Sequence, residues 1–298
     1  MLENRVKVTR HNRFVNIVER MRRLRISAIS YLNTAPLMWA FEHGQSGRQF
    51  EISYTLPSAC ARALAAGTAD IGIIPAAAYT QIPNLQILPD VAIASRQAVR
   101  SILLVSKVPI QEVRTVALDT SSMTSVALTK ILFAKWLGGA RTYTPMEPVI
   151  EHMLEECDAG LVIGDPALQI DPSGHHTLDL AEEWILRTGK PFVFAFWAVR
   201  SEALLELEPS LDLASTFRDS RDHGLEPASL AVIGRDWAPK IKISEQDVRR
   251  YLTENIHYRL DNECIEGLQL FYRYGAEIGA LPNAPALRFV ESAKVLAG

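Results

Sequence analysis

The order strand, helix, strand in the N-terminal quarter of the chain constrains the fold more than any other feature. Branched residues predict strands at Leu24 to Ile29 and at Phe50 to Thr55. A helix is expected to begin at Pro57 and to end at Gly67, and Ala69 to Pro75 is expected to be the next strand and turn. Strands connected through helices pair in parallel with right-handed crossovers. The chain is therefore expected to have an α/β fold.

A second unit repeats this pattern after a predicted crossing point at Val105 to Pro109. It is expected to contain strands at 116–118 and 159–163, helices at 124–137 and 148–156, and a closing return strand at 192–199. Beyond Arg200 the pattern is helical, most clearly at 246–260 and 262–278, and these helices are expected to pack on the first unit.

These patterns predict two α/β lobes, with the second lobe inserted into the first. Residues 24–106 and 198–298 are assigned to the first lobe and residues 107–197 to the second. A length of 298 residues fits about two domains of ordinary size. Two lobes connected by two crossing segments are expected to form a ligand cleft between them, at the carboxyl ends of the strands.

Composition excludes several classes of function. Hydrophobic residues are 48% and charged residues 22% of the chain, with no apolar run near the ~18 residues that span a bilayer, so no membrane insertion is expected. A net charge of -3 gives no indication of nucleic-acid binding. Residues 1–23 form a basic extension without the apolar core of a secretion signal, which favours a cytoplasmic protein.

The cysteine and histidine residues indicate neither a disulfide framework nor a metal site. Cys60, Cys157 and Cys264 are far apart in helical-looking segments, as is typical of reduced packing residues. The chain has no Cys-x-x-Cys or His-x-x-x-His pair and no acidic calcium loop. No metal is expected.

Three short polar segments each follow a β-like apolar run. They are Ser30-Tyr31-Leu32-Asn33-Thr34-Ala35-Pro36-Leu37, Val99-Arg100-Ser101 and Asp119-Thr120-Ser121-Ser122-Met123-Thr124-Ser125. The first and third lead into the first turn of a helix, where free backbone N–H groups and the helix dipole attract carboxylates. The three segments therefore predict one binding site for a small, multiply acidic ligand.

Together with three further motifs, these segments resemble the chorismate dehydratases, a family of menaquinone biosynthesis enzymes. The further motifs are Asp70-Ile71-Gly72-Ile73-Ile74-Pro75, Ile163-Gly164-Asp165-Pro166-Ala167-Leu168 and Pro191-Phe192-Val193-Phe194-Ala195-Phe196-Trp197-Ala198. The resemblance covers the chain from about Leu24 to Gly279. It implies a two-lobed fold like that of the type II periplasmic binding proteins, acting as a cytoplasmic lyase without a metal or an organic cofactor.

The resemblance also implies a reaction, in which chorismate loses water to give 3-[(1-carboxyvinyl)oxy]benzoate in the futalosine route to menaquinone. The sequence departs from the family at Met123, where an Arg is common. If that Arg contacts a carboxylate, its role must pass here to backbone N–H groups, to hydroxyls or to Arg100. Two other functions stay open: a cytosolic binding or sensor protein for small carboxylates, and the related dihydroxynaphthoate synthase, whose opening loop differs from Tyr31-Leu32-Asn33-Thr34.

Asn33 is the expected catalytic residue, because its amide can donate a hydrogen bond to a leaving hydroxyl or a carboxylate and can accept one from the hydroxyl, without itself titrating. From the sequence alone it could equally be a turn or helix-cap residue before Pro36. The residues expected to bind substrate are Tyr31, Ser58, Arg100, Ser101, Asp119, Ser121, Ser122, Thr124, Ser125 and Asp165.

The identity of the proton acceptor stays open. Asp119 and Asp165 each end a predicted strand at the cleft, and either could be a general base if burial raised its pKa, or a helix cap. A carboxylate there would also repel a dianionic substrate. A sharper hypothesis is that the enolpyruvyl carboxylate of the substrate takes the C3 proton while the protein positions the substrate and stabilises the departing hydroxyl.

Overall fold

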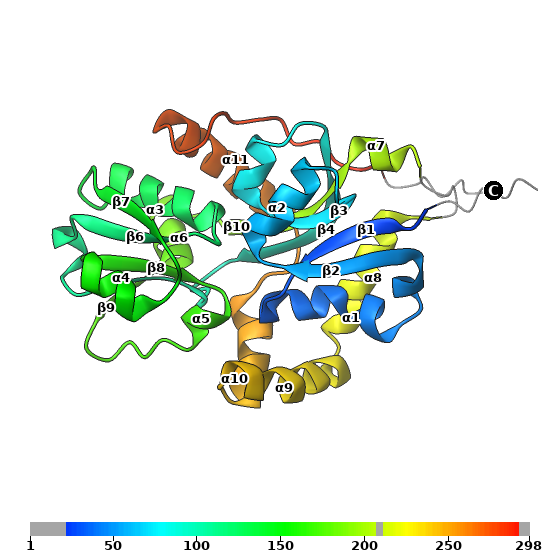
Figure 1. Ribbon diagram of the computed structural model, residues 1–298, viewed down its shortest axis with the longest axis horizontal. Coiled ribbons are helices and arrows are strands. Elements are labelled where there is room, and N and C mark those ends of the chain that lie inside the picture. The colour runs from blue at the N-terminus through cyan, green and yellow to red at the C-terminus, as the bar shows by residue number, and fades with distance from the viewer. Residues whose placement is uncertain (1–21, 207–210, 292–298) are drawn as a thin grey trace, which may run out of the picture.

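The computed structural model describes residues 22–206 and 211–291, which form two lobes side by side (Figure 1). Each lobe is built on a mixed five-stranded sheet. The first sheet has the order β2 (Phe50–Thr55), β1 (Leu24–Ile29), β3 (Ile71–Pro75), β10 (Phe192–Arg200) and β4 (Leu85–Ser95). The second has the order β7 (Thr142–Met146), β6 (Thr115–Asp119), β8 (Ala159–Ile163), β5 (Ile102–Ser106) and β9 (His176–Asp179). We call these the first and the second lobe.

The predicted alternation of strands and helices is confirmed in the first lobe. β1 pairs in parallel with both β2 and β3, and helices α1 (Ala35–His43) and α2 (Pro57–Ala65) connect these strands. Pro36 and Pro57 lie in the first turns of the two helices, where the missing N–H of proline removes no helical hydrogen bond. β1 and β2 have the bounds expected from the sequence.

Two strands belong to the opposite sheet from the one expected. β5 was assigned to the first lobe but pairs antiparallel with β8 and β9 of the second. β10 was expected to close the second lobe but pairs antiparallel with β3 and β4 of the first. The chain therefore crosses between the lobes after β4 and before β10, so the boundaries at 106/107 and 197/198 are wrong. Each strand is almost wholly buried and suits the interior of either sheet, so local pattern does not select its partner.

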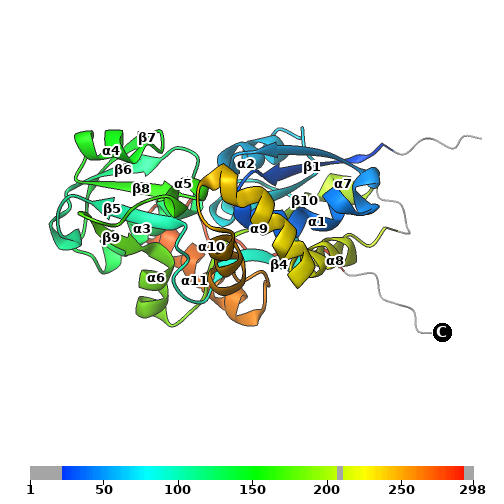
Figure 2. The same cartoon turned by 90° about the horizontal axis from the view of Figure 1, so that it is seen from below.

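The C-terminal helices contact both lobes and not only the first (Figure 2). α8 (Leu213–Gly224) packs on α1, whereas α9 (Pro227–Ile241) reaches α5 (Asp165–Leu168) of the second lobe. α11 (Asn262–Glu277) packs on β10 and also on α3 (Thr124–Lys135). The C-terminal part of the chain therefore spans the junction. The second lobe is completed by α4 (Ile150–Glu156) and α6 (Leu180–Thr188), and the short α7 (Ser201–Leu204) follows β10.

The helix expected at 246–260 is interrupted. α10 (Glu245–Arg250) gives way to a π-helical turn at Tyr251–Asn255 and then to extended chain. The extended part lies against β4: His257 and Ala94 exchange backbone hydrogen bonds at 2.8 and 2.9 Å, and the Ala92 N–H donates to the Tyr258 carbonyl. These tertiary bonds override the helical pattern of the sequence.

The core is continuous between the lobes and centres on β10. Phe196 and Trp197 are fully buried, and the Trp197 ring lies 4.7 Å from that of Phe217. The three cysteines are buried and unbonded to one another, as expected of packing residues. Most of the basic extension, residues 1–21, lies outside the described residues, and Arg22 pairs with buried Asp70 at 2.6 Å. Within the described part of the chain, no helix is both long and apolar enough to cross a membrane.

Candidate functional site

A small cavity of about 50 Å³ lies at the junction of the lobes. The loop after β1, the start of β5 and the segment between β6 and α3 all contribute to its wall, so the three polar segments meet as predicted. Its polar side chains are those of Tyr31, Asn33, Ser101, Ser122, Thr124 and Ser125, and its apolar residues include Ile29, Pro57, Pro75, Ile93, Ile102, Met123, Ile163, Phe194 and Ala195. None of the described residues that line it is a Lys or an Arg.

Asn33 and Ser101 are connected through a tyrosine far away in the sequence. The Tyr251 hydroxyl donates to Ser101 Oγ at 2.8 Å and accepts from Asn33 Nδ2 at 3.3 Å. The Tyr258 hydroxyl donates to the backbone carbonyl of Asn33 at 3.0 Å. Burial raises the pKa of Tyr251, so the phenol stays neutral.

Tyr31 crosses from the first lobe to the second. Its hydroxyl lies 3.4 Å from Ser121 Oγ, and its ring lies against the backbone of Gly164, where a Cβ atom would be only 2.6 Å from a ring carbon. Gly164 has φ +67°, a conformation that few residues other than glycine adopt readily. One residue further along, the Leu32 N–H donates to Asp165 Oδ1 at 3.0 Å.

The N-terminus of α3 faces the cavity. Ser122, Met123, Thr124 and Ser125 line the cavity there, and no side chain among the described residues caps this helix. Its first-turn N–H groups therefore stay available for an anion. The Thr124 side chain itself serves packing, because its hydroxyl donates to the Phe194 carbonyl at 3.0 Å and accepts from the Ala77 N–H at 3.1 Å.

The two candidate acids lie beside the cavity and do not line it. Burial raises the pKa of Asp165 to about 6, partly offset by the Leu32 N–H. Burial also raises the pKa of Asp119, whose Oδ1 accepts from the Ser121 hydroxyl at 2.6 Å and the Ser121 N–H at 2.8 Å. Asp119 Oδ2 is buried without a hydrogen-bond partner among the described residues.

Three other predicted binding residues do not line the cavity. Ser121 is buried and bonded to Asp119 behind the wall. Ser58 lies in the first turn of α2, where its N–H donates to the Ser121 carbonyl at 3.1 Å. Arg100 is exposed, and its N–H donates to Asp179 at 2.6 Å from a left-handed backbone with φ +62°. Arg100 is therefore not the cation that replaces an Arg at Met123 in this conformation.

Sequence reasoning did not identify Tyr251 and Tyr258. Both lie where a continuous helix was expected, so their spacing is typical of core packing. Their hydroxyls reach Asn33 only because the π-helical turn and the extended chain bend back toward β4. A π-helical turn often occurs at a functional site, but its position is visible only in the structure.

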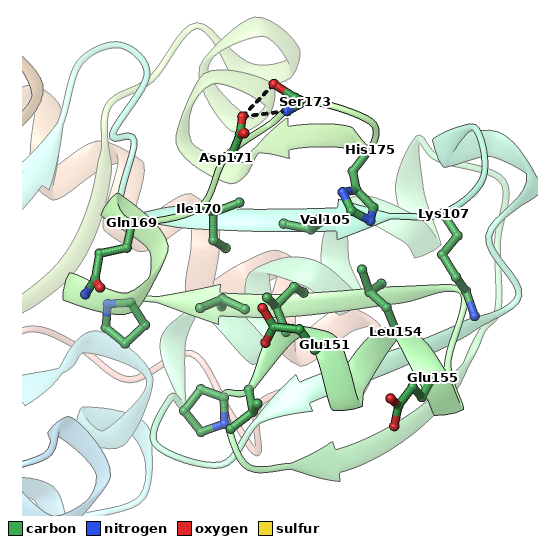
Figure 3. A pocket seen from close by; sticks show the side chains of 15 residues that line it. Val105, Lys107, Glu151, Leu154, Glu155, Gln169, Ile170, Asp171, Ser173 and His175 are labelled. Atoms are coloured by element: carbon green, nitrogen blue, oxygen red, sulfur yellow. Dashed lines mark hydrogen bonds between the residues drawn. The ribbon is translucent and has the colours of Figure 1, made fainter. Parts of the chain in front are cut away.

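A larger groove of about 840 Å³ lies on the second lobe, away from the junction (Figure 3). Its lining includes the apolar side chains of Val105 and Val162, together with the charged residues Lys107, Glu151 and Glu155. The side chain of Val105 lies at its floor (Figure 3). None of the predicted site residues lines it. The small cavity, where those residues converge, is therefore the better candidate for chemistry despite its size.

One side-chain cluster elsewhere has the composition of a metal site. His257, Asp261 and Cys264 bring ligand atoms within 4.8 Å of one another. However, Arg96 pairs with Asp261 Oδ2 at 2.8 Å, the same oxygen that lies 2.7 Å from His257 Nε2. A guanidinium at that oxygen competes with a cation, so the cluster is better described as an ion-paired helix cap, with Asp261 accepting from the Cys264 N–H.

Comparison with known proteins places the chain in a family. Residues 24–277 match the family model described as menaquinone biosynthesis. A protein of Thermus thermophilus named chorismate dehydratase is 31% identical over 273 residues, which cover 86% of this chain and 94% of that protein.

Solved structures show the same fold at low identity. The periplasmic aliphatic sulphonate binding protein SsuA of Escherichia coli has a TM-score of 0.63 at 14% identity, covering 92% of this chain and 94% of that one. The alkanesulfonate-binding protein SsuA of Xanthomonas axonopodis pv. citri, bound to MOPS, has a TM-score of 0.61 at 15% identity, covering 88% and 95%. The fold is therefore that of the periplasmic binding proteins, as the family resemblance implies.

Proposed function

The chain belongs to the menaquinone biosynthesis family, and on that premise we propose that it is a lyase that dehydrates chorismate to 3-[(1-carboxyvinyl)oxy]benzoate. The observation that carries the proposal is the 31% identity to a chorismate dehydratase over 86% of the chain. The cavity at the lobe junction supplies groups that suit this reaction.

Recognition of the substrate rests on neutral donors. Chorismate carries two carboxylates, and the cavity offers the uncapped N-terminus of α3 together with the hydroxyls of Ser122 and Ser125. Backbone N–H groups and a helix dipole bind anions without a side-chain cation. This arrangement accounts for how a site with Met123 in place of an Arg can still hold a dianion.

The reaction breaks two bonds and forms an aromatic ring. The C3 proton leaves to a base, its electron pair forms the new ring double bond, and the C4 hydroxyl departs as hydroxide, which takes that proton back from the base to give water. Asn33 and Ser101 lie together on the cavity wall and are the groups that we assign to the departing oxygen. Hydrogen bonds to developing negative charge are strongest in an enclosed site with little water.

The base is the carboxylate of the enolpyruvyl group in this proposal. Two observations support it. Neither Asp119 nor Asp165 lines the cavity, and each already accepts hydrogen bonds from the protein. A substrate carboxylate close to C3 would take the proton without adding a protein carboxylate to a cleft that already holds a dianion.

The cavity is too small for chorismate as it stands, since about 50 Å³ holds only a few water molecules. Substrate entry therefore requires the lobes to part. The hydrogen bonds from Tyr31 and Leu32 to the second lobe are among the contacts that would break on opening and re-form on closure.

The test is to incubate the purified protein with chorismate and to follow products by chromatography and mass spectrometry, without added metal or nucleotide. Loss of one water by the wild type, and its absence in Asn33→Ala, is the expected result. Intact chorismate with measurable binding would favour a carboxylate-binding protein. The absence of both binding and turnover would contradict the proposal. The substrate of dihydroxynaphthoate synthase would then be tested next.

A further inference from the structure

The Tyr251 hydroxyl is a branch point between the two polar side chains assigned to the departing oxygen. A phenolic hydroxyl has a single hydrogen to donate, and Tyr251 donates it to Ser101 Oγ at 2.8 Å. Its oxygen then accepts from Asn33 Nδ2 at 3.3 Å. The side chain is only 1% exposed, so water does not compete for these bonds.

The direction of these bonds decides what the cavity offers to a ligand. Because Ser101 Oγ accepts from Tyr251, the hydrogen of Ser101 remains free to point elsewhere. Because the amide nitrogen of Asn33 faces Tyr251, one of its two hydrogens is used there and the second is left for a ligand. In the same amide orientation, Asn33 Oδ1 accepts from the Thr34 hydroxyl at 3.4 Å.

The fold holds Tyr251 in place from several sides. The Asn255 side-chain amide donates to the Ala98 carbonyl at 2.9 Å, and the Ser95 hydroxyl donates to the Asn255 carbonyl at 2.9 Å. Tyr258 bonds to the backbone of Asn33 itself. The π-helical turn is thus fixed both to the crossing segment before β5 and to the loop after β1, and it sets the phenol between them.

We propose that Tyr251 is a positioning residue that fixes both Asn33 and Ser101 as hydrogen-bond donors toward the ligand. The catalytic part of this inference rests on the proposed function. Without the phenol, the Asn33 amide can turn and Ser101 can donate to protein groups, so the same side chains would meet the ligand with their donors misdirected.

The first experiment compares Tyr251→Phe with Tyr79→Phe, each of which removes one hydroxyl and keeps the ring. Tyr79 is a matched control outside the cavity: it is 6% exposed, donates to the Ala286 carbonyl at 3.3 Å and accepts from the Arg288 N–H at 3.0 Å. We expect Tyr251→Phe to lower kcat on chorismate about tenfold or more, with a smaller change in KM, and Tyr79→Phe to retain wild-type kcat.

Coupling distinguishes positioning from general loss of structure. If Tyr251 acts through its two partners, adding Tyr251→Phe to a variant that already carries Ser101→Ala should lower kcat by much less than it does in the wild type. Full additivity of the two losses would overturn the inference.

A second readout does not depend on the substrate. In the ligand-free, ¹⁵N-labelled protein, the side-chain amide of Asn33 is identified by its loss in Asn33→Ala. Its resonances should move in Tyr251→Phe but not in Tyr79→Phe. They should also move in Ser101→Ala, although among the described residues Ser101 has no direct hydrogen bond to Asn33 and is connected to it only through Tyr251. If Tyr251→Phe does not fold, Ser101→Ala still carries this test.

An unmoved amide in both variants would overturn the inference, even if chorismate is dehydrated. Conversely, a protein that leaves chorismate intact refutes the proposed function, while a moved amide still supports the placement of Asn33 by Tyr251.

Discussion

The backbone N–H of Leu32 in the first lobe donates to Oδ1 of Asp165 in the second lobe, at 3.0 Å. This bond connects the loop that carries Asn33 to the end of β8, so it forms only when the lobes are close together. It also places a titrating group at the closing edge, because burial raises the pKa of Asp165 to about 6.

The raised pKa of Asp165 predicts a pH-dependent contribution to stability. The folded state holds this proton more tightly than the unfolded state, so the contribution of Asp165 falls as pH rises from about 4 to about 6. A pKa difference of about two between the folded and unfolded states corresponds to at most about 3 kcal/mol in the free energy of unfolding. Urea unfolding across this range should show wild type losing stability relative to Asp165→Asn. Parallel pH curves for the two proteins would contradict a raised pKa.

Removal of either acid should leave turnover largely intact if the base is the substrate carboxylate. Asp119→Asn and Asp165→Asn are each expected to retain kcat on chorismate within about tenfold, whereas loss of a true general base costs about 100-fold or more. Steady-state kinetics with a separate binding measurement checks this. Unchanged binding with abolished turnover in either variant would instead identify that residue as the base.

An arginine at position 123 should tighten binding of a dianion. Met123 lines the cavity beside the N-terminus of α3, where no Lys or Arg of the described chain lines the wall. A charge-assisted bond to a carboxylate predicts that Met123→Arg lowers the Kd of the product about tenfold at low salt, and less at high salt. Met123→Gln, which is long and neutral, is the control. Equal affinities for the two variants would place the ligand carboxylates elsewhere.

Loss of the Thr124 hydroxyl should destabilise the junction of the lobes. Thr124→Val leaves the Ala77 N–H and the Phe194 carbonyl without this partner in a buried setting, which predicts a loss of about 1–3 kcal/mol. Thr124→Ser keeps the hydroxyl and should therefore retain most of the stability that Thr124→Val loses. Thr129→Val is a buried control that removes only a bond to a carbonyl of its own helix, so its unfolding midpoint should fall less.

The sequence predicted the parts of the fold that depend on local pattern. β1, β2 and β8 have the expected bounds because branched residues are flanked by turn residues there. β5 and β10 were assigned to the wrong lobes because pairing between distant strands decides their sheet. The helix expected at 246–260 ends at Arg250 because bonds to Ala94 and Ala92 hold the following chain extended.

The same division applies to the site. The meeting of Asn33, Ser101 and the α3 N-terminus was predictable, because each follows a strand or begins one at the same edge of the lobes. Tyr251 was not, because it lies 150 residues beyond Ser101 and its phenol arrives through tertiary structure alone. Arg100 was expected at the ligand but is exposed to solvent. Its backbone is left-handed, and its N–H donates to Asp179.

Gly164 determines how far the cleft can shut. The Tyr31 ring rests directly on its backbone, in the space that any side chain would occupy. A single methyl group at this position would collide with the Tyr31 ring and would hold the lobes apart by about its own thickness. The Leu32 N–H would then not reach Asp165. Under the proposed function, such a protein would exchange its ligand quickly but would seldom seal it from water, so the lack of a side chain at Gly164 would help to set the residence time of the reactant.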